Sequence, residues 1–196
     1  MNEPDRFRLI IVRPGLSELD EQGRIAGNLD VPLSEEGKKQ ALAIADELKE
    51  LGVRKILSGP TTASHETAEI LGEQFGVKIK VDEDLKSFDC GLWHGKRIEE
   101  LKVTQPKIFK LWQEQPSAVA PPNGENLEDL TTRVHKFAKK LIKKPKPGTI
   151  VVVASEPVAS TLRSIIESVD VATHWSVEPN CGSWFEVTLD LETAGV

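Results

Sequence analysis

The sequence predicts an α/β protein, a three-layer α/β/α sandwich around a mostly parallel central sheet. Short apolar segments rich in Ile and Val alternate with longer segments of helical periodicity, which is the pattern of parallel strands joined by helices. The segment 149–155, TIVVVAS, is a continuous β-branched run typical of a central strand that is buried on both faces. A length of 196 residues with 39% hydrophobic composition indicates one globular domain over residues 1–196.

The first half of the chain is expected to supply three strands and two helices. Residues 6–12, RFRLIIV, form an apolar run too short for a helix, and Pro14 follows it. Ser34 is placed to cap a helix over 34–51, whose leucines and alanines keep helical spacing until Gly52. The other elements expected here are a long loop (15–33), a strand (53–58), a helix (61–75) and a third, alternating strand (78–82).

The second half is expected to begin with short helices and to end with a strand. Residues 127–142 have the spacing of an amphipathic helix, whose lysine-rich end is broken by the segment KKPKPG. A proline-rich surface loop, QPSAVAPPNGEN, precedes that helix. The remaining expected elements are helices over 98–101, 106–113 and 158–169, the central strand over 149–155, and a last strand over 183–191.

Composition and charge exclude several classes of function. The formal net charge of −6 argues against nucleic acid or an anionic membrane as the main partner. Cys90 and Cys181 are too few for a disulfide framework and lack metal-ligand spacing. The chain has no signal-peptide pattern and no apolar run near the roughly 18 residues of a membrane span. We therefore expect a reduced, cytoplasmic setting, with no metal and no cofactor, and a small molecule or a protein as partner.

Chemistry is expected at the carboxyl ends of the parallel strands, where α/β sheets bind their ligands. Three such ends stand out, at residues 13–15, 58–60 and 155–157. The Arg13 guanidinium suits a phosphate or carboxylate ligand. The alternative is that Arg13 is tied to a nearby carboxylate as part of the scaffold, and Glu156 at a neighbouring strand end is a candidate for that carboxylate. The sequence alone leaves both interpretations open.

Six motifs follow one another along the chain. They are LIIVRPG (9–15), a Gly-Arg pair (23–24) with DVPLSEEG (30–37), SGPTTASHETA (58–68), SFDCGLWHG (87–95), PNGE (122–125) and VVVASEP (151–157). In this order and at these spacings, they resemble the motifs of the histidine phosphatase superfamily, the phosphoglycerate mutase-like proteins, over nearly the whole chain. The resemblance implies their α/β/α fold, with a small helical cap over about residues 96–125.

The resemblance also implies a catalytic centre of five residues, four of which are replaced here. The nucleophilic histidine of the family falls on Pro14, which has no nucleophilic nitrogen. A second phosphate-clamping arginine falls on Ala63, and the carboxylic acid that protonates the leaving group falls on Ser87. The second histidine falls on Glu156, whose charge is wrong for stabilising a phosphoryl group. Of this core, the chain keeps Arg13.

Further positions of the chain are candidates for ligand binding. Ser17 and Gly27 match phosphate-contacting positions of the mutase branch, whereas Asp20 stands where that branch has asparagine. Arg24 belongs to the Gly-Arg motif, and His94 is placed to touch the rim of the pocket. The candidate ligand-binding residues are Arg13, Ser17, Arg24, Gly27 and His94.

Two functions follow from these observations. The first is a catalytically inactive member of the superfamily, kept for binding or regulation, in which an Arg13–Glu156 ion pair fills the phosphate position. The alternative is an active phosphomonoesterase or phosphoglycerate mutase-like enzyme whose chemistry has been rerouted, through His94 or His65. The absence of a nucleophile at the first strand end favours the inactive member. The ligand, the partner and the oligomeric state are left open by the sequence.

Overall fold

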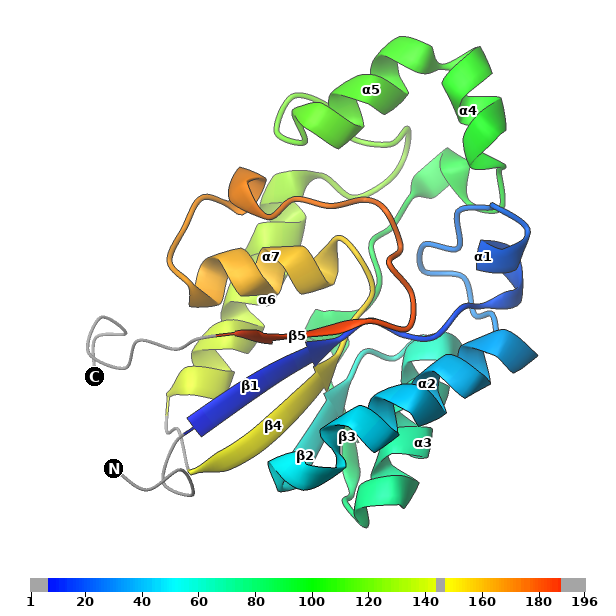
Figure 1. The fold of residues 1–196 in the computed structure, drawn as a ribbon. Coiled ribbons are helices and arrows are strands. Elements are labelled where there is room, and N and C mark those ends of the chain that lie inside the picture. The colour runs from blue at the N-terminus through cyan, green and yellow to red at the C-terminus, as the bar shows by residue number, and fades with distance from the viewer. Residues whose placement is uncertain (1–6, 144–146, 188–196) are drawn as a thin grey trace.

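The computed structural model describes residues 7–143 and 147–187. Its centre is a five-stranded sheet in the order β3-β2-β4-β1-β5 (Figure 1). Neighbouring strands are parallel, except that β5 runs antiparallel to β1. The strands are β1 (Phe7–Val12), β2 (Val53–Ser58), β3 (Ile79–Val81), β4 (Gly148–Val153) and β5 (Trp184–Val187). The mostly parallel sheet expected from the sequence is confirmed.

Helices cover both faces of this sheet, because side chains alternate between the faces along each strand. In β1, Leu9 and Ile11 pack into the core beneath one pair of helices, while Ile10 and Val12 pack beneath the other pair. All four side chains are fully buried. The first pair is α6 (Leu127–Ile142) with α7 (Val158–Ile166), and the second pair is α2 (Glu35–Leu48) with α3 (Thr62–Phe75).

The helix boundaries follow the expected capping signals in most places. The Ser34 hydroxyl accepts a hydrogen bond from the Gly37 N–H at 3.1 Å and caps α2. A 3-10 turn (Lys49–Leu51) continues α2, and Gly52 then takes the left-handed conformation, with φ of 59°. The helix expected over 127–142 is α6 with the same bounds.

The structure differs from the expected elements in several places. The loop expected over 15–33 contains a short helix, α1 (Glu18–Glu21), because Ser17 and Asp20 form a capping box. The helix expected over 158–169 ends at Ile166, and Ser168 has a positive φ of 55°. The strand expected over 149–155 is displaced by one or two residues at its ends. The last strand begins at Trp184, one residue after its expected start, and residues 188–191 of the expected range lie outside the described part.

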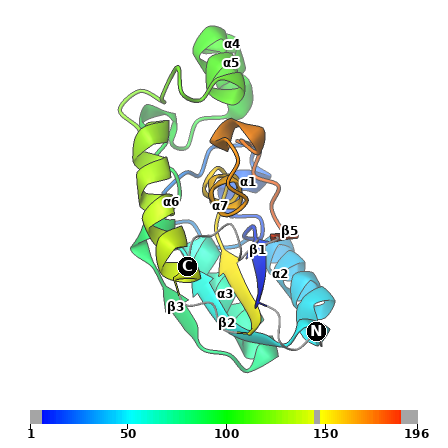
Figure 2. The ribbon, with the colours of Figure 1, turned by 90° about the vertical axis from the view of Figure 1, so that its left-hand side faces the viewer.

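Two helices stand apart from the three layers. They are α4 (Ile98–Thr104), longer than its expected range, and α5 (Pro106–Glu114), and they lie within the segment expected to form a cap. Figure 2 shows them at one end of the molecule, opposite α2 and α3. Trp112 of α5 packs edge-on against Trp93, with ring centroids 5.3 Å apart. The Trp175 indole donates a hydrogen bond to the Trp112 carbonyl at 3.0 Å, which ties α5 to the body. Among the helices described, none has the length and apolar composition required of a bilayer span.

Candidate functional site

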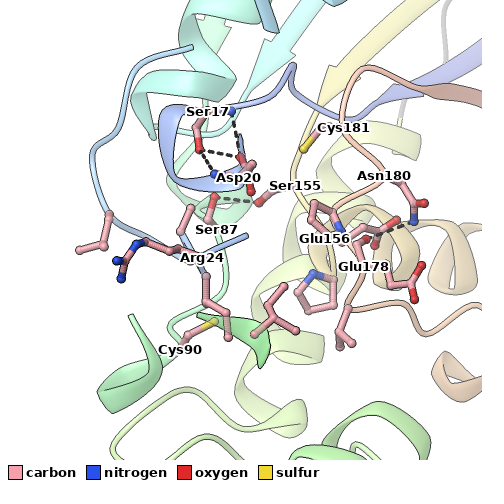
Figure 3. A pocket seen from close by; sticks show the side chains of 18 of the residues that line it. Ser17, Asp20, Arg24, Ser87, Cys90, Ser155, Glu156, Glu178, Asn180 and Cys181 are labelled. Carbon is pink, nitrogen blue, oxygen red and sulfur yellow. Dashed lines mark hydrogen bonds between the residues drawn. The ribbon is translucent and has the colours of Figure 1, made fainter. Parts of the chain in front are cut away.

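A pocket of about 490 Å³ lies at the carboxyl ends of the strands, between the sheet and the helices α4 and α5 (Figure 3). Two of the three strand ends singled out by the sequence, 13–15 and 155–157, contribute to it, and the residue directly after the third, 58–60, also lines it. Pro14 follows β1, Thr61 follows β2, and Ser155 and Glu156 follow β4. The parallel strands therefore bring segments far apart in the chain to one side of the sheet, as expected for this fold class.

Arg13 and Glu156 form an ion pair at the base of this site. The Arg13 Nε donates to Glu156 Oε1 at 2.6 Å, and the Ser160 backbone N–H donates to Glu156 Oε2 at 3.0 Å. The Glu156 side chain is 1% exposed and the Arg13 side chain 16%. Both oxygens of a buried carboxylate are thus hydrogen-bonded, one of them to a cation. Of the two interpretations that the sequence left open for Arg13, the structure shows the one in which Glu156 is its partner.

The rest of the Arg13 guanidinium is engaged by the segment that leads into and forms β5. Its Nη1 donates to the Ser183 hydroxyl at 3.1 Å, and its central carbon lies 4.7 Å from the centroid of the Phe185 ring. Arg13 is not among the residues that line the pocket, although its neighbour Pro14 is. The Arg13 guanidinium is therefore turned toward other parts of the protein.

Hydroxyl groups line the pocket around Ser87, the position on which the resemblance places the family's acid. The Ser155 hydroxyl donates to Ser87 at 2.8 Å, and Ser87 and Thr61 lie 3.3 Å apart between their hydroxyl oxygens. The Thr61 hydroxyl in turn donates to Ser64 at 3.0 Å. We call these four residues the hydroxyl cluster. It is uncharged, so it supplies neither a phosphate-clamping cation nor an acid strong enough to protonate a leaving group.

Asp20 adds a carboxylate to the lining of the pocket. The sequence shows Asp20 where the mutase branch has asparagine, but Asp20 is not among the candidate ligand-binding residues predicted from it. Its Oδ2 accepts hydrogen bonds from both the backbone N–H and the hydroxyl of Ser17, the former at 2.9 Å. Ser17 itself is 1% exposed, and its hydroxyl caps α1. The spacing Ser-x-x-Asp was the signal for this arrangement. Within residues 7–143 and 147–187, no basic side chain forms an ion pair with Asp20.

Three of the other candidate residues share one side of the site. Arg24 lines the pocket, while its Nη1 donates to the Gly95 carbonyl at 2.6 Å. Gly27 also lines it, with a positive φ of 56°, and a Cβ at this position would overlap the His94 imidazole. The His94 Nε2 lies 3.1 Å from the Cys90 backbone nitrogen and 3.4 Å from that of Asn28, and accepts from both N–H groups. His94 therefore connects two loops, and it is not among the lining residues.

His65, Cys90 and Cys181 are the other side chains with potential nucleophilic character near the site. His65 is not among the lining residues, and its Nε2 lies 3.4 Å from Glu69 Oε1 on the same helix. Cys90 and Cys181 both line the pocket. Burial, with Asp89 and Glu125 nearby, raises the pKa of the Cys90 thiol to about 12. Burial and the adjacent Asp20 raise the pKa of Cys181 to about 12. Both thiols are therefore protonated near neutral pH and are poor nucleophiles.

One wall of the pocket comes from a segment that sequence reasoning missed. Residues 177–181, between α7 and β5, line it opposite the loop that contains Arg24 (Figure 3). Glu178 in this wall is exposed. The segment contains none of the six motifs, so nothing in the sequence singled it out. Its position follows from the antiparallel return of the chain to β1, which only the tertiary structure reveals.

Comparison with known proteins agrees with this geometry. Residues 9–195 match the family model described as histidine phosphatase superfamily (branch 1). Phosphoserine phosphatase 1 of Hydrogenobacter thermophilus is 32% identical over 169 residues, which cover 86% of this chain and 80% of that protein. A bifunctional protein of Mycobacterium tuberculosis is 29% identical over 163 residues, 82% of this chain but 44% of that longer protein.

A solved structure shows the same architecture. The mycobacterial glucosyl-3-phosphoglycerate phosphatase in complex with VO3 has a TM-score of 0.82 and 26% sequence identity to this chain, and the match covers 91% of each. The order of the motifs, the sheet topology, the placement of the pocket and the match over residues 9–195 agree with one another. The chain belongs to the histidine phosphatase superfamily, branch 1.

Proposed function

We propose that this protein is a member of the superfamily that binds a ligand in the family's pocket without transferring phosphate through a histidine. The observation on which the proposal rests is the Arg13–Glu156 ion pair, with 2.6 Å between Nε and Oε1. A phosphate dianion placed at this strand end would meet a carboxylate, and the arginine beside it already has a counterion. Like charges repel, so the site disfavours the group that the family's catalytic centre accepts.

The lining residues support the same conclusion, because among the described residues they include neither a histidine nucleophile nor the second phosphate-clamping arginine of the family. Pro14 has no nitrogen that could attack phosphorus, and it follows β1 where the nucleophile is expected. No histidine is among the residues that line the pocket in the described part of the chain. Each hydrogen-bond donor aimed at the developing charge of a transition state contributes about 3 kcal/mol. The changes at Ala63 and Glu156 therefore remove stabilisation that the other residues do not replace.

The names of the relatives favour a second candidate, an active phosphomonoesterase or mutase-like enzyme. Phosphoserine phosphatase 1 is the relative at 32% identity, and the solved structure is named as a phosphatase. Such an enzyme would need a new nucleophile, since His65 and His94, the residues considered for rerouting, do not line the pocket. The Asp20 carboxylate is the lining group best suited to that role, because the two lining thiols stay protonated.

Hydrolysis of p-nitrophenyl phosphate distinguishes the two functions. The wild-type protein is compared with a quadruple variant, Pro14→His, Ala63→Arg, Ser87→Glu and Glu156→His, and with the phosphoserine phosphatase of Hydrogenobacter as a positive control. We expect no turnover by the wild type and none by the single variant Glu156→His. Robust wild-type turnover that is lost in Asp20→Asn would overturn the proposal and establish the rerouted enzyme. Thermal unfolding of each variant verifies that it is folded.

A further inference from the structure

We infer that the pocket takes a ligand that presents a protonated amine on an apolar body, and that Asp20 binds the amine. The inference rests on the proposed function, because it assigns a ligand class to the same pocket. It starts from the charges of the lining residues, which include four carboxylates and two basic side chains. The carboxylates are those of Asp20, Glu99, Glu156 and Glu178, and the basic residues are Arg24 and Lys102.

Most of these charges are compensated within the protein. Glu156 is paired with Arg13, and Glu99 lies 2.8 Å from the Lys102 ammonium on α4. Glu178 is exposed and therefore solvated. Asp20 is partly buried, and the donors around it are uncharged, namely the backbone N–H and hydroxyl of Ser17 and the adjacent Cys181 thiol. A carboxylate that loses part of its hydration and has no counterion favours a cation as its next partner.

Arg24 does not neutralise Asp20. Its guanidinium is held by the Gly95 carbonyl at 2.6 Å through Nη1 and by Gln22 Oε1 at 3.1 Å through Nε. Figure 3 shows Arg24 at one side of the pocket, with Glu178 and Asn180 at the other, and Asp20 beside Ser17 and Ser155. The end of the pocket at Asp20 is thus negatively charged, and the basic group stands apart from it.

The hydroxyl cluster supplies the remaining acceptors for an ammonium group. An ammonium has three N–H donors, and each hydroxyl oxygen has lone pairs beyond the single hydrogen that it donates. Ser87 and Ser155 lie on the same side of the pocket as Asp20 (Figure 3), and both line it. A phosphate in this place would find hydroxyl donors but no cation. An ammonium finds a carboxylate together with neutral acceptors.

The other walls of the pocket are apolar, and they favour an apolar body in the ligand. Side chains from the loop after α1, from α4 and α5 and from the segment before β5 face the pocket, among them Ile25, Ile98, Phe109, Trp112 and Val177. Phe109 and Trp112 both lie on α5, with ring centroids 6.0 Å apart. Such walls favour an aliphatic or aromatic body over a sugar, because they offer few hydrogen bonds and gain from the burial of apolar surface.

Three matched probes test the ligand class by isothermal titration calorimetry near neutral pH. Phenethylamine, 2-phenylethanol and phenyl phosphate share a ring and differ in their polar head. We expect the wild type to bind the amine at least about tenfold more tightly than the alcohol, since a charge-assisted hydrogen bond exceeds a neutral one by about 1.4 kcal/mol. Phenyl phosphate is expected to bind most weakly. A wild type that prefers phenyl phosphate, or that binds none of the three at millimolar concentration, overturns the inference.

Two variants assign the preference to Asp20. Asp20→Asn keeps an oxygen that can accept from Ser17, so α1 stays capped while the charge is removed. Its amine-to-alcohol affinity ratio should fall to about one. The control is Glu21→Gln, which makes the same charge change on the same helix at an exposed residue outside the lining. An unchanged ratio in Asp20→Asn, or an equal loss in Glu21→Gln, contradicts the inference.

The two proposals fail on different results. Wild-type turnover of p-nitrophenyl phosphate refutes the proposed function, and it is measured without any of the three probes. A protein that turns over no phosphate ester and shows no preference for the amine leaves the proposed function standing and removes the ligand assignment. A protein that prefers the amine and hydrolyses no ester supports both.

Discussion

Arg13 and Glu156 lie 143 residues apart in the sequence, yet the Arg13 Nε is 2.6 Å from Glu156 Oε1. The register of the sheet accounts for this proximity. Val12 at the end of β1 pairs with Val153 of the parallel strand β4, so the residues that follow the two strands leave the sheet side by side. A cation after one strand and a carboxylate after the other therefore meet without any rearrangement of the fold. The pair is a consequence of topology together with two residue types.

Removal of the cation from this pair should destabilise the protein strongly. We expect Arg13→Met to lower the free energy of unfolding by about 3–5 kcal/mol, because Glu156 then remains buried and charged without a counterion. Urea denaturation monitored by tryptophan fluorescence measures the change. The control is Arg8→Met, which breaks the more exposed Arg8–Glu186 pair, 3.3 Å between Arg8 Nε and Glu186 Oε1. That loss should stay below about 1 kcal/mol.

The coupling between the two residues is tested by a double variant. Arg13→Met with Glu156→Leu removes both charges and should recover most of the stability lost in Arg13→Met. Simple additivity of the two single changes would show that the ion pair does not connect these residues energetically.

A second buried ion pair holds the loop before α6 in place. Glu125 accepts from Arg133 Nε at 2.6 Å and from Nη2 at 2.8 Å, and its side chain is 9% exposed. Arg133 Nη1 also donates to the Asp84 carbonyl at 3.0 Å. We expect Glu125→Ala to lower the free energy of unfolding by about 3–5 kcal/mol, because a buried guanidinium loses its bidentate partner.

The exposed Glu128, three residues later on α6, provides the matched control for this pair. Glu128→Ala should cost less than about 1 kcal/mol, since it removes only a favourable charge near the helix amino terminus. Chemical denaturation measures the free energy of unfolding of both variants. Similar losses in the two would argue against a structural role for the buried pair.

Asp84 should make stability depend on pH in the acid range. Burial opposes its ionisation, but hydrogen bonds from the ammonium groups of Lys140 at 2.6 Å and Lys136 at 3.0 Å hold its pKa below the ordinary value of 3.8. The folded state therefore binds the proton less tightly than the unfolded state does. The contribution is complete above the unfolded pKa and is lost as the pH falls through the lower, folded pKa.

The variant Asp84→Asn isolates this contribution. Its stability deficit, measured by urea denaturation, should be constant near neutral pH and should shrink as the pH falls below about 4. The double variant Lys136→Gln with Lys140→Gln should also be less stable than the wild type near neutral pH, and its stability deficit should shrink in the same pH range. A deficit that grows on acidification would contradict the assignment.

The sequence predicted most of the fold because its local signals agree with its packing. The β-branched run of β4 is buried on both faces, and Ser34 and Gly52 mark the ends of one helical segment. The short helix α1 was missed, since four residues carry too little periodicity to be recognised. In that case the capping residues Ser17 and Asp20 decide the structure, rather than an apolar pattern.

The candidate site could be predicted only in part. The strand ends and the Arg13–Glu156 pair follow from the sheet topology and from the family motifs. The direction of the Arg13 side chain depends on Ser183 and Phe185, which lie far along the chain, and no pattern in the sequence connects them to it. His94 was expected at the rim of the pocket, but its Nε2 accepts from two backbone N–H groups between loops. Such roles depend on tertiary contacts that a single sequence does not encode locally.

The affinity for vanadate tests most directly whether the strand-end pocket accepts a phosphoryl group. The mycobacterial relative was solved in complex with VO3, so that protein serves as the positive control. Isothermal titration of the wild-type chain with vanadate should show no saturable binding, with a dissociation constant above about 1 mM. Saturable binding of vanadate at micromolar concentration, abolished by Arg13→Met, would contradict the account.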